Sequence, residues 1–207
     1  AGVLSVGSIG DGGVAGNLGQ AAAAVGNVVL GGGTLRFTGV TALSNRGFTL
    51  AASTTSTIEI SDAAATLTVS GGSAATTGAL IKTGAGTLKF SAATSYTGLT
   101  TISAGKLEYG IINALSSGAV TVNGGILDIQ TFTDTVGTVT LTAGSIIGTT
   151  GILTGTSYVM NGTSDTSVSA ILAGAVTLVK SGAGTLTLAG TNTYSSNLGV
   201  LECQRRA

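Results

Sequence analysis

The chain has 207 residues, with Gly at 35 positions and no Pro, Trp or His, and its 8 basic residues balance 8 acidic ones. Charged residues make up 8% of the chain and hydrophobic residues 43%, which excludes the highly charged, apolar-poor composition of a disordered protein. The absence of His excludes serine–histidine and cysteine–histidine catalysis in their usual forms and removes the commonest zinc ligand.

Two further classes are excluded by the distribution of residues. The basic residues are scattered, with no patch beyond Arg205 and Arg206, so nucleic-acid binding is not expected. No apolar run approaches the about 18 residues that a membrane-spanning helix requires. The opening AGVLSVGSIG has no basic segment of the kind that begins a signal peptide, so an export signal is expected to be removed or to lie outside this stretch.

We expect residues 1–26 to form an N-terminal coil or cap. Their stretch GDGGVAG, Gly10–Gly16, has the glycine content of a phosphate-binding loop, but it lacks the preceding strand, the following helix and the lysine of such a loop. Asp11 is a single near-match to calcium-binding glycine–aspartate repeats. A series of glycine turns is therefore the favoured interpretation.

Short alternating strands and glycine turns follow from residue 27 onward, as in NVVLGGGTLRF. In the later stretch TLKF, Leu88 and Phe90 alternate with Thr87 and Lys89, and this period of two predicts one buried and one solvated face. Strands of about five residues between frequent turns leave no room for an α-helix.

Three segments in the middle of the chain repeat one pattern: TISAGKLEY, TVNGGILDI and TLTAGSIIG, which begin at Thr101, Thr121 and Thr140. The equivalent positions hold the glycines Gly105, Gly125 and Gly144, a first apolar set Ile102, Val122 and Leu141, and a second apolar set Leu107, Leu127 and Ile147. A unit of about 20 residues is too short to bury its own core, so we expect the units to stack.

Stacked units of this length predict a parallel β-solenoid over residues 27–199, with each apolar set forming one interior column. About ten coils, at about 4.8 Å per coil, would make a rod of about 50 Å. A β-sandwich has strands of similar spacing but requires no constant register, and the blades of a propeller recur at about 40 to 50 residues.

A fifteen-residue stretch occurs twice, as KTGAGTLKFSAATSY from Lys82 and as KSGAGTLTLAGTNTY from Lys180. Both lysines precede a Gly-Ala-Gly turn. The favoured interpretation is that each lysine caps a coil corner and keeps the surface soluble, and the alternative is that it presents charge to a partner.

Tyrosine closes each copy of this stretch, at Tyr96 and Tyr194. Together with Tyr109 and Tyr158, these rings are interpreted as covers over turns. The alternative is stacking against sugar rings, which exposed aromatic side chains can provide.

This ordered series resembles the autotransporter-associated β-strand repeat of bacterial passenger domains. The likeness lies in the two KxGAGTL turns, in GLTTISAGKL, and in NALSSGAVTVNGGILDI, Asn113–Ile129. It implies a right-handed parallel β-helix, exposed on or released from the outer surface of a Gram-negative-type cell. It also implies a structural or adhesive role without catalytic residues, and a separate translocator as the membrane anchor.

Residues 200–207 are expected to form an irregular tail, because LECQRRA breaks the repeat. This tail holds the single cysteine, Cys203, so no disulfide can form within the chain. The chain is therefore interpreted as a passenger fragment, or as a related repeat protein that is exported in another way.

One pair of acidic residues has the spacing of the repeat. Glu108 and Asp128 lie 20 positions apart and should occupy adjacent coils, where carbohydrate-cleaving β-helices can cluster carboxylates. An exposed, outward-facing pair beside Leu107 and Leu127 is the favoured interpretation. No catalytic, metal-binding or cofactor-binding residue is assigned.

The sequence thus predicts a non-enzymatic, rigid stalk at the cell surface or outside the cell, with surfaces for adhesion. Its partners are expected to be further copies of itself, host or other surfaces, or glycans. A self-assembling extracellular fibre or surface-layer subunit is one alternative, because low charge and open strand edges favour association. A carbohydrate-binding or carbohydrate-degrading β-helix is the other.

Overall fold

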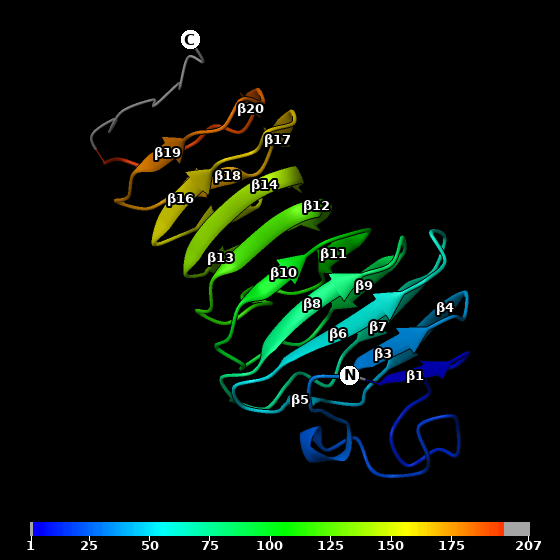
Figure 1. The fold of residues 1–207 in the computed structure, drawn as a ribbon. Helices are drawn as coiled ribbons and strands as arrows, with labels where there is room; N and C mark the ends of the chain where they lie inside the picture. Colours follow the sequence, from blue (N-terminus) through cyan, green and yellow to red (C-terminus); the bar gives the residue numbers. More distant parts are fainter. Residues whose placement is uncertain (1, 197–207) are drawn as a thin grey trace.

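The computed structural model describes residues 2–196, which form a single stack of coils (Figure 1). Every strand pair in this stack is parallel, and coils of about 20 residues follow one another about eight times. The predicted all-β parallel solenoid is confirmed. The tail predicted at 200–207, with Cys203, lies outside the described residues.

The number of coils is lower than expected because the first coils are longer. Val3 pairs with Thr34, 31 positions later, and Thr34 pairs with Thr57, 23 positions later. The later coils keep the predicted length, since Thr101 pairs with Thr121.

The strands lie on three faces of the stack, and the third face holds two short separate sheets rather than a strand from every coil. The first face contains β1 (Val3–Val6), β3 (Thr34–Phe37), β6 (Thr55–Ile60), β8 (Ala79–Thr83), β10 (Thr100–Ile102), the first halves of β12 (Val120–Asp128) and β14 (Thr138–Ile147), β16 (Ser157–Met160) and β19 (Leu178–Lys180). The second face contains β4 (Thr41–Ser44), β7 (Thr66–Val69), β9 (Thr87–Phe90), β11 (Lys106–Tyr109), the second halves of β12 and β14, β17 (Thr166–Val168) and β20 (Leu186–Leu188). The third face contains β2 (Val29–Leu30), β5 (Thr49–Leu50), β13 (Thr133–Thr135), β15 (Ile152–Thr154) and β18 (Ile171–Ala173). A 3₁₀ turn, η1 (Val25–Asn27), precedes β2, and residues 2–196 contain no α-helix.

The first apolar column forms as predicted. Ile102 pairs with Val122, and Val122 pairs with Leu141, and all three side chains are fully buried. Burying a side chain of this size contributes about 1.5 to 3 kcal/mol, so the stacking of coils supplies the core that one coil lacks.

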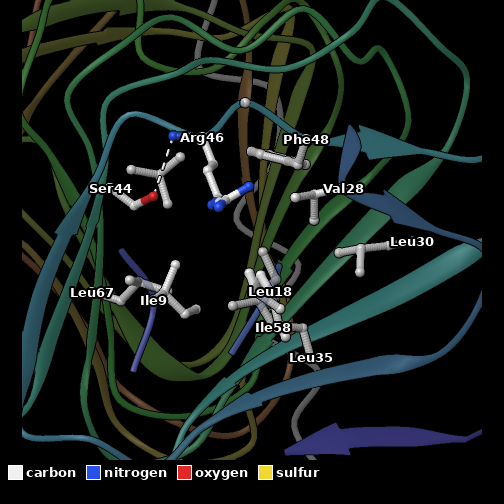
Figure 2. Close-up of a pocket in the computed structure, with 12 residues that line it drawn as sticks. Ile9, Leu18, Val28, Leu30, Leu35, Ser44, Arg46, Phe48, Ile58 and Leu67 are labelled. Carbon is white, nitrogen blue, oxygen red and sulfur yellow. Dashed lines mark hydrogen bonds between the residues drawn. The ribbon is translucent and has the colours of Figure 1, made fainter. Parts of the chain in front are cut away.

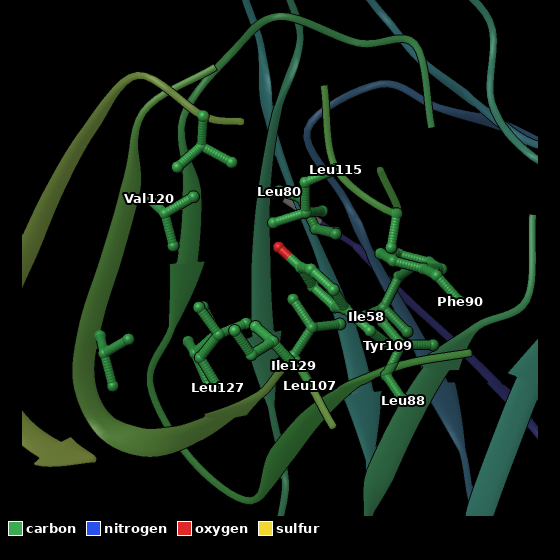
Figure 3. Packing of buried hydrophobic residues seen from close by; sticks show 14 of the residues in the cluster. Ile58, Leu80, Leu88, Phe90, Leu107, Tyr109, Leu115, Val120, Leu127 and Ile129 are labelled. Atoms are coloured by element: carbon green, nitrogen blue, oxygen red, sulfur yellow. The ribbon is translucent and has the colours of Figure 1, made fainter. Parts of the chain in front are cut away.

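The second apolar column differs from the prediction at its third member. Leu107 pairs with Leu127, and Leu127 pairs with Ile146, which is buried. Ile147 lies opposite Asp128 instead and is only half-buried. The cause is that this coil advances by 19 residues, so the inward position falls one residue earlier. Figure 3 shows this part of the core, with Leu107, Leu127 and their apolar neighbours packed together.

The predicted glycine position lies at the corner between the first and second faces. Gly105 and Gly144 both have positive φ, +60° and +87°, which only glycine adopts at little cost. A Cβ atom on Gly144 would overlap the carbonyl oxygen of Gly125 in the coil before it. Glycine is therefore required here both by the turn and by the close approach of successive coils.

Candidate functional site

The outer side of the first face carries a row of hydroxyl-bearing residues. Strand pairing aligns Thr34 with Thr57, and Thr101 with Thr121 and Thr140. We call these five residues the threonine row; Ile81 interrupts it between Thr57 and Thr101. Their side chains face outward because the neighbouring positions, such as those of Ile102 and Val122, face the core. The row offers repeated hydrogen-bonding groups without net charge.

The outer side of the second face carries a ladder of four charged residues. Lys89 donates to Glu108 at 2.8 Å, and Lys106 lies 2.5 Å from Glu108 and 3.3 Å from Asp128. Glu108 and Asp128 pair across adjacent coils, as predicted. They are not an exposed pair, however, since Asp128 is only 6% exposed.

This ladder gives Glu108 the wrong properties for a general acid. Burial opposes the charge on Glu108, but the hydrogen bonds and charges of Lys106 and Lys89 outweigh it and lower the pKa of Glu108. A carboxyl group that protonates a glycosidic oxygen needs a raised pKa instead. The arrangement is that of a structural ion-pair network.

A shallow hollow lies next to the ladder, lined by Asp128, Gln130, Ile147, Thr149 and Ser169 among others. The carboxylate of Asp128 accepts hydrogen bonds from the backbone N–H and the side-chain amide of Gln130. Its oxygens are therefore already engaged within the chain, and the hollow offers mainly the hydroxyl groups of Thr149 and Ser169.

Lys82 is not on the surface, which corrects the favoured interpretation. It occupies the first interior column between Ile58 and Ile102 and is fully buried. Its Nζ donates to the carbonyl oxygens of Thr83, Gly84 and Ala104 at 2.8, 3.0 and 3.1 Å. Burial lowers the pKa of Lys82 to about 8, although the charge of Glu59 opposes this change.

Lys82 therefore caps a coil corner from inside the solenoid. Lys180 repeats two of its contacts, since its Nζ donates to the carbonyl oxygens of Ser181 and Gly182 at 2.7 and 2.8 Å. Lys180 is half-buried, because its strand β19 is the last of the first face in the described residues. Lys82 precedes Ile102 by 20 residues, which is one coil length, and Ile102 was predicted to face inward. The spacing of the repeat therefore indicated an inward position for Lys82 as well.

The tyrosines are mostly unavailable to a ligand. Tyr96, Tyr109 and Tyr158 are buried, and Tyr194 is half-buried. The hydroxyl of Tyr96 lies 2.8 Å from that of Thr100. Burial thus removes the sugar-stacking alternative for three of the four rings.

The interior also holds a pair of polar groups that the sequence did not reveal. Tyr109 Oη and Asp134 Oδ1 are both buried without a hydrogen-bond partner, whereas Asp134 Oδ2 accepts from the backbone N–H of Leu115 at 3.0 Å. Burial raises the pKa of Asp134 and, together with the nearby carboxyl group, that of Tyr109.

The glycine-rich stretch Gly10–Gly16 lies around a cation, which is the reverse of a phosphate site. The carbonyl oxygens of Gly10 and Asp11 accept hydrogen bonds from the guanidinium group of Arg46, whose side chain Figure 2 shows among the apolar residues of the first coils. A phosphate-binding loop presents backbone N–H groups instead. Gly13 has a φ of +83°, in agreement with the expected glycine turn.

Residues 2–196 contain neither a cluster of metal-ligating side chains nor a helix that could span a membrane. No group of three or more acidic, cysteine or histidine side chains is placed to hold a metal ion. No helix in that range has the length and apolar character needed to cross a lipid bilayer.

Comparison of the sequence with known proteins shows similarity to bacterial autotransporters. Residues 80–108 and 178–197 match the passenger-associated transport repeat, and each match includes one KxGAGTL turn. The chain is also similar to the adhesin BmaC autotransporter of Brucella suis biovar 1 (strain 1330), at 39% identity over 209 residues that cover 97% of the chain. It spans 6% of the length of that relative. No solved structure matches the chain.

Proposed function

Because the chain belongs to the autotransporter passenger-repeat family, we propose that it is a non-enzymatic segment of a surface-exposed adhesin, forming a rigid stalk that also presents adhesive surface. The relative named an adhesin supports exposure at the outer membrane or outside the cell. The partners that we propose are host or other surfaces, bound by many weak contacts.

The observation that carries this proposal is the continuity of the first face. Its strands pair without a break from β1 to β19. A force applied at one end is therefore transmitted through the hydrogen bonds between successive coils. The threonine row on its outer side is neutral and repetitive. Such a surface suits multivalent contact better than recognition of one small ligand, because five coils offer a threonine at the same outward position.

Self-association is the second candidate, favoured by exposed apolar side chains on the edge strands. At one end of the stack Leu43 is 64% exposed, and Val3 and Leu4 are also exposed. At the other end Val179 and Leu188 are partly exposed. Apolar edge strands are typical sites of association, and they support a fibre or surface layer as the alternative assembly.

The adhesive role can be tested with beads coated with the purified chain. The change is a triple substitution, Thr101→Lys, Thr121→Lys and Thr140→Lys, which alters only outward positions of the threonine row. We expect wild-type beads to attach to cultured cells or to surfaces coated with extracellular-matrix protein. The triple variant should attach less, because three lysine side chains add charge and bulk to the neutral threonine row.

The matched control places three lysines on the second face, at Thr66, Thr68 and Thr87, which also lie at half-buried strand positions. Circular dichroism of all variants checks that the fold is kept. If wild-type beads attach no better than beads with an unrelated protein, the adhesive role is contradicted. A compact particle in small-angle X-ray scattering would contradict the stalk.

A further inference from the structure

Two asparagine–glycine pairs occupy the same corner of the solenoid in different coils. Asn123–Gly124 follows Val122, and Asn161–Gly162 follows Met160. Val122 pairs with Leu141, and Leu141 pairs with Met160, so both asparagines begin the turn that leads from the first face to the second. Both asparagine side chains are exposed.

An asparagine followed by glycine can lose its side-chain amide without a catalyst. The backbone nitrogen of the glycine attacks Cγ of the asparagine and forms a C–N bond, and the side-chain nitrogen leaves as ammonia with the proton of the backbone N–H. Water then opens the cyclic imide and leaves aspartate or isoaspartate. The attack requires a backbone that can turn this nitrogen toward Cγ, and glycine permits the turn because it lacks a Cβ atom. The surroundings of each pair therefore decide its rate.

The backbone at Gly124 is restrained little by strand pairing. Pairing with the coil before stops at Val122 and resumes at Ile126, and pairing with the coil after shifts its register over the same stretch. Gly124 is exposed and has a φ of +111°. Figure 1 shows β12 bending round this corner beside β14. The reacting nitrogen thus lies in the part of β12 that has the fewest inter-coil restraints.

The backbone at Gly162 is held more firmly. Gly162 is buried, and its carbonyl oxygen accepts from the backbone N–H of Gly184 at 3.1 Å. The backbone N–H of Asn161 donates to the carbonyl oxygen of Leu141, also at 3.1 Å. A Cβ atom on Gly162 would lie 2.8 Å from the carbonyl oxygen of Thr142, so the coil before packs closely against it. Turning the nitrogen of Gly162 toward the asparagine would break these contacts.

A hydroxyl group also faces the reacting amide of Asn123. Thr142 Oγ1 donates to Asn123 Oδ1 at 2.8 Å and lies 3.2 Å from the carbonyl oxygen of Val122. Negative charge develops on Oδ1 when the backbone nitrogen attacks Cγ, and a donor that is already in place stabilises this charge. The neighbouring coil therefore assists the reaction at Asn123.

From this arrangement we propose that Asn123 is a site of spontaneous deamidation in the folded protein, that the hydroxyl of Thr142 assists the reaction, and that Asn161 is protected. The product adds one negative charge to a chain whose formal net charge is zero. Asn123 lies two positions after Thr121, so the new carboxylate stands beside the threonine row. The isoaspartate product also lengthens the backbone of this corner by one atom.

The test is peptide mapping of the purified chain after storage in a mildly alkaline buffer. Samples are digested with pepsin at acid pH, and mass spectrometry measures the mass gained at each asparagine when OH replaces the amide NH2. In urea the two pairs should react at similar rates, because glycine follows both asparagines. In the folded protein we expect Asn123 to react about fivefold or more faster than Asn161, because folding restrains only the second pair.

The role of the hydroxyl is tested with Thr142→Val, which keeps the shape of the side chain and removes the donor. It should slow the reaction at Asn123 about threefold in the folded protein and leave the rate in urea unchanged. Thr142→Ser keeps a hydroxyl group and should retain the wild-type rate. Circular dichroism checks that each variant is folded.

The matched control is Asn123→Gln, whose longer side chain forms the corresponding ring far more slowly. It should show no mass gain at position 123, and ion-exchange chromatography should lose the more acidic species that wild-type protein accumulates. Equal rates at Asn123 and Asn161 in the folded protein overturn the proposed site. An unchanged rate at Asn123 in folded Thr142→Val protein overturns the role of the hydroxyl.

Discussion

At the scale of single residues, the interior of the solenoid uses backbone carbonyl groups to hold positive charge. Lys82 and Arg46 are both buried and both donate to carbonyl oxygens at turns. Turn carbonyls are available because they have no strand partner, and a long cationic side chain reaches them from an inward position. Each cation thus donates to turn carbonyl groups, some of which also accept a second hydrogen bond, as Gly10 does from Ser44.

The lowered pKa of Lys82 predicts a rise of stability with pH. In the unfolded chain the pKa of lysine is about 10.4, so between pH 8 and that value the unfolded state binds more protons than the folded state. Stability then increases with pH. From pH 7.5 to 9.5 we expect the free energy of unfolding to rise by about 1 to 2 kcal/mol, as measured by urea denaturation.

The variant Lys82→Met tests the origin of this rise. Methionine fills the same space without a titrating group, so the rise between pH 7.5 and 9.5 should disappear. Lys180→Met is the control, because Lys180 is half-buried, and it should keep the rise. An equal rise in wild-type and Lys82→Met proteins would assign it to another group.

Two buried tyrosines predict opposite responses to loss of the hydroxyl group. The hydroxyl of Tyr158 lies 2.6 and 2.7 Å from the carbonyl oxygens of Leu153 and Ala173 and accepts from the N–H of Gly155 at 2.8 Å. Tyr158→Phe should therefore cost about 1 to 3 kcal/mol, whereas Tyr109→Phe removes an unpartnered group and should be neutral or stabilising by about 1 kcal/mol. Thermal unfolding measures both, and a larger loss for Tyr109→Phe would reveal a partner.

The sequence predicted apolar positions well and buried polar positions poorly. Ile102 and Val122 could be assigned from period and spacing because apolar burial follows alternation. Lys82 could not be assigned to the core from its residue type, since lysine is almost always exposed. The burial of Asp134 could not be predicted from the sequence pattern, because it depends on a neighbouring coil that brings Leu115 beside it.

At the scale of the element, coil length decides which side chain faces inward. A coil of 20 residues and a coil of 19 residues both stack, but they place the second inward residue differently. The assignment of Ile147 was wrong for this reason, and Ile146 is the buried residue. The offset between the two coils is 19 on both sides of the corner, at Val122 with Leu141 and at Leu127 with Ile146, so the spacing of the first apolar set already indicated Ile146.

The glycines at the coil corner predict a position-specific cost of adding a methyl group. Gly144→Ala places a Cβ atom on a residue with positive φ and makes that atom overlap the carbonyl oxygen of Gly125. We expect the substitution to destabilise the protein by about 3 kcal/mol. Gly13→Ala is the control, because Gly13 also has a positive φ but has open space around it, so the cost should be about 1 kcal/mol. Equal losses in urea denaturation would contradict the role of coil spacing.

At the scale of the whole molecule, each coil contacts mainly the coil before and the coil after it. Removal of one complete coil, residues 120–138, joins Ala119 to Val139, and Val139 already pairs with Val120. We expect a folded rod shorter by about 4.8 Å, with an unchanged β-type circular dichroism spectrum and a modest loss of stability. Small-angle scattering measures the length.

A deletion of 120–134 is the control for that experiment, because it removes most of a coil and breaks the register of all later ones. It should abolish cooperative unfolding. If both deletions behave alike, stability does not depend on the repeat, and the model of stacked, interchangeable coils fails at the level of the molecule.

The threonine row has a consequence for any long ligand that lies along it. A translation by one coil brings each hydroxyl of Thr101 and Thr121 nearly onto its successor, so an extended polymer would find several almost equivalent alignments. Its attachment would strengthen with the number of coils covered and would tolerate slippage under load. Multivalent attachment of this kind weakens gradually as coils are removed, whereas binding in a single pocket can be abolished by one substitution.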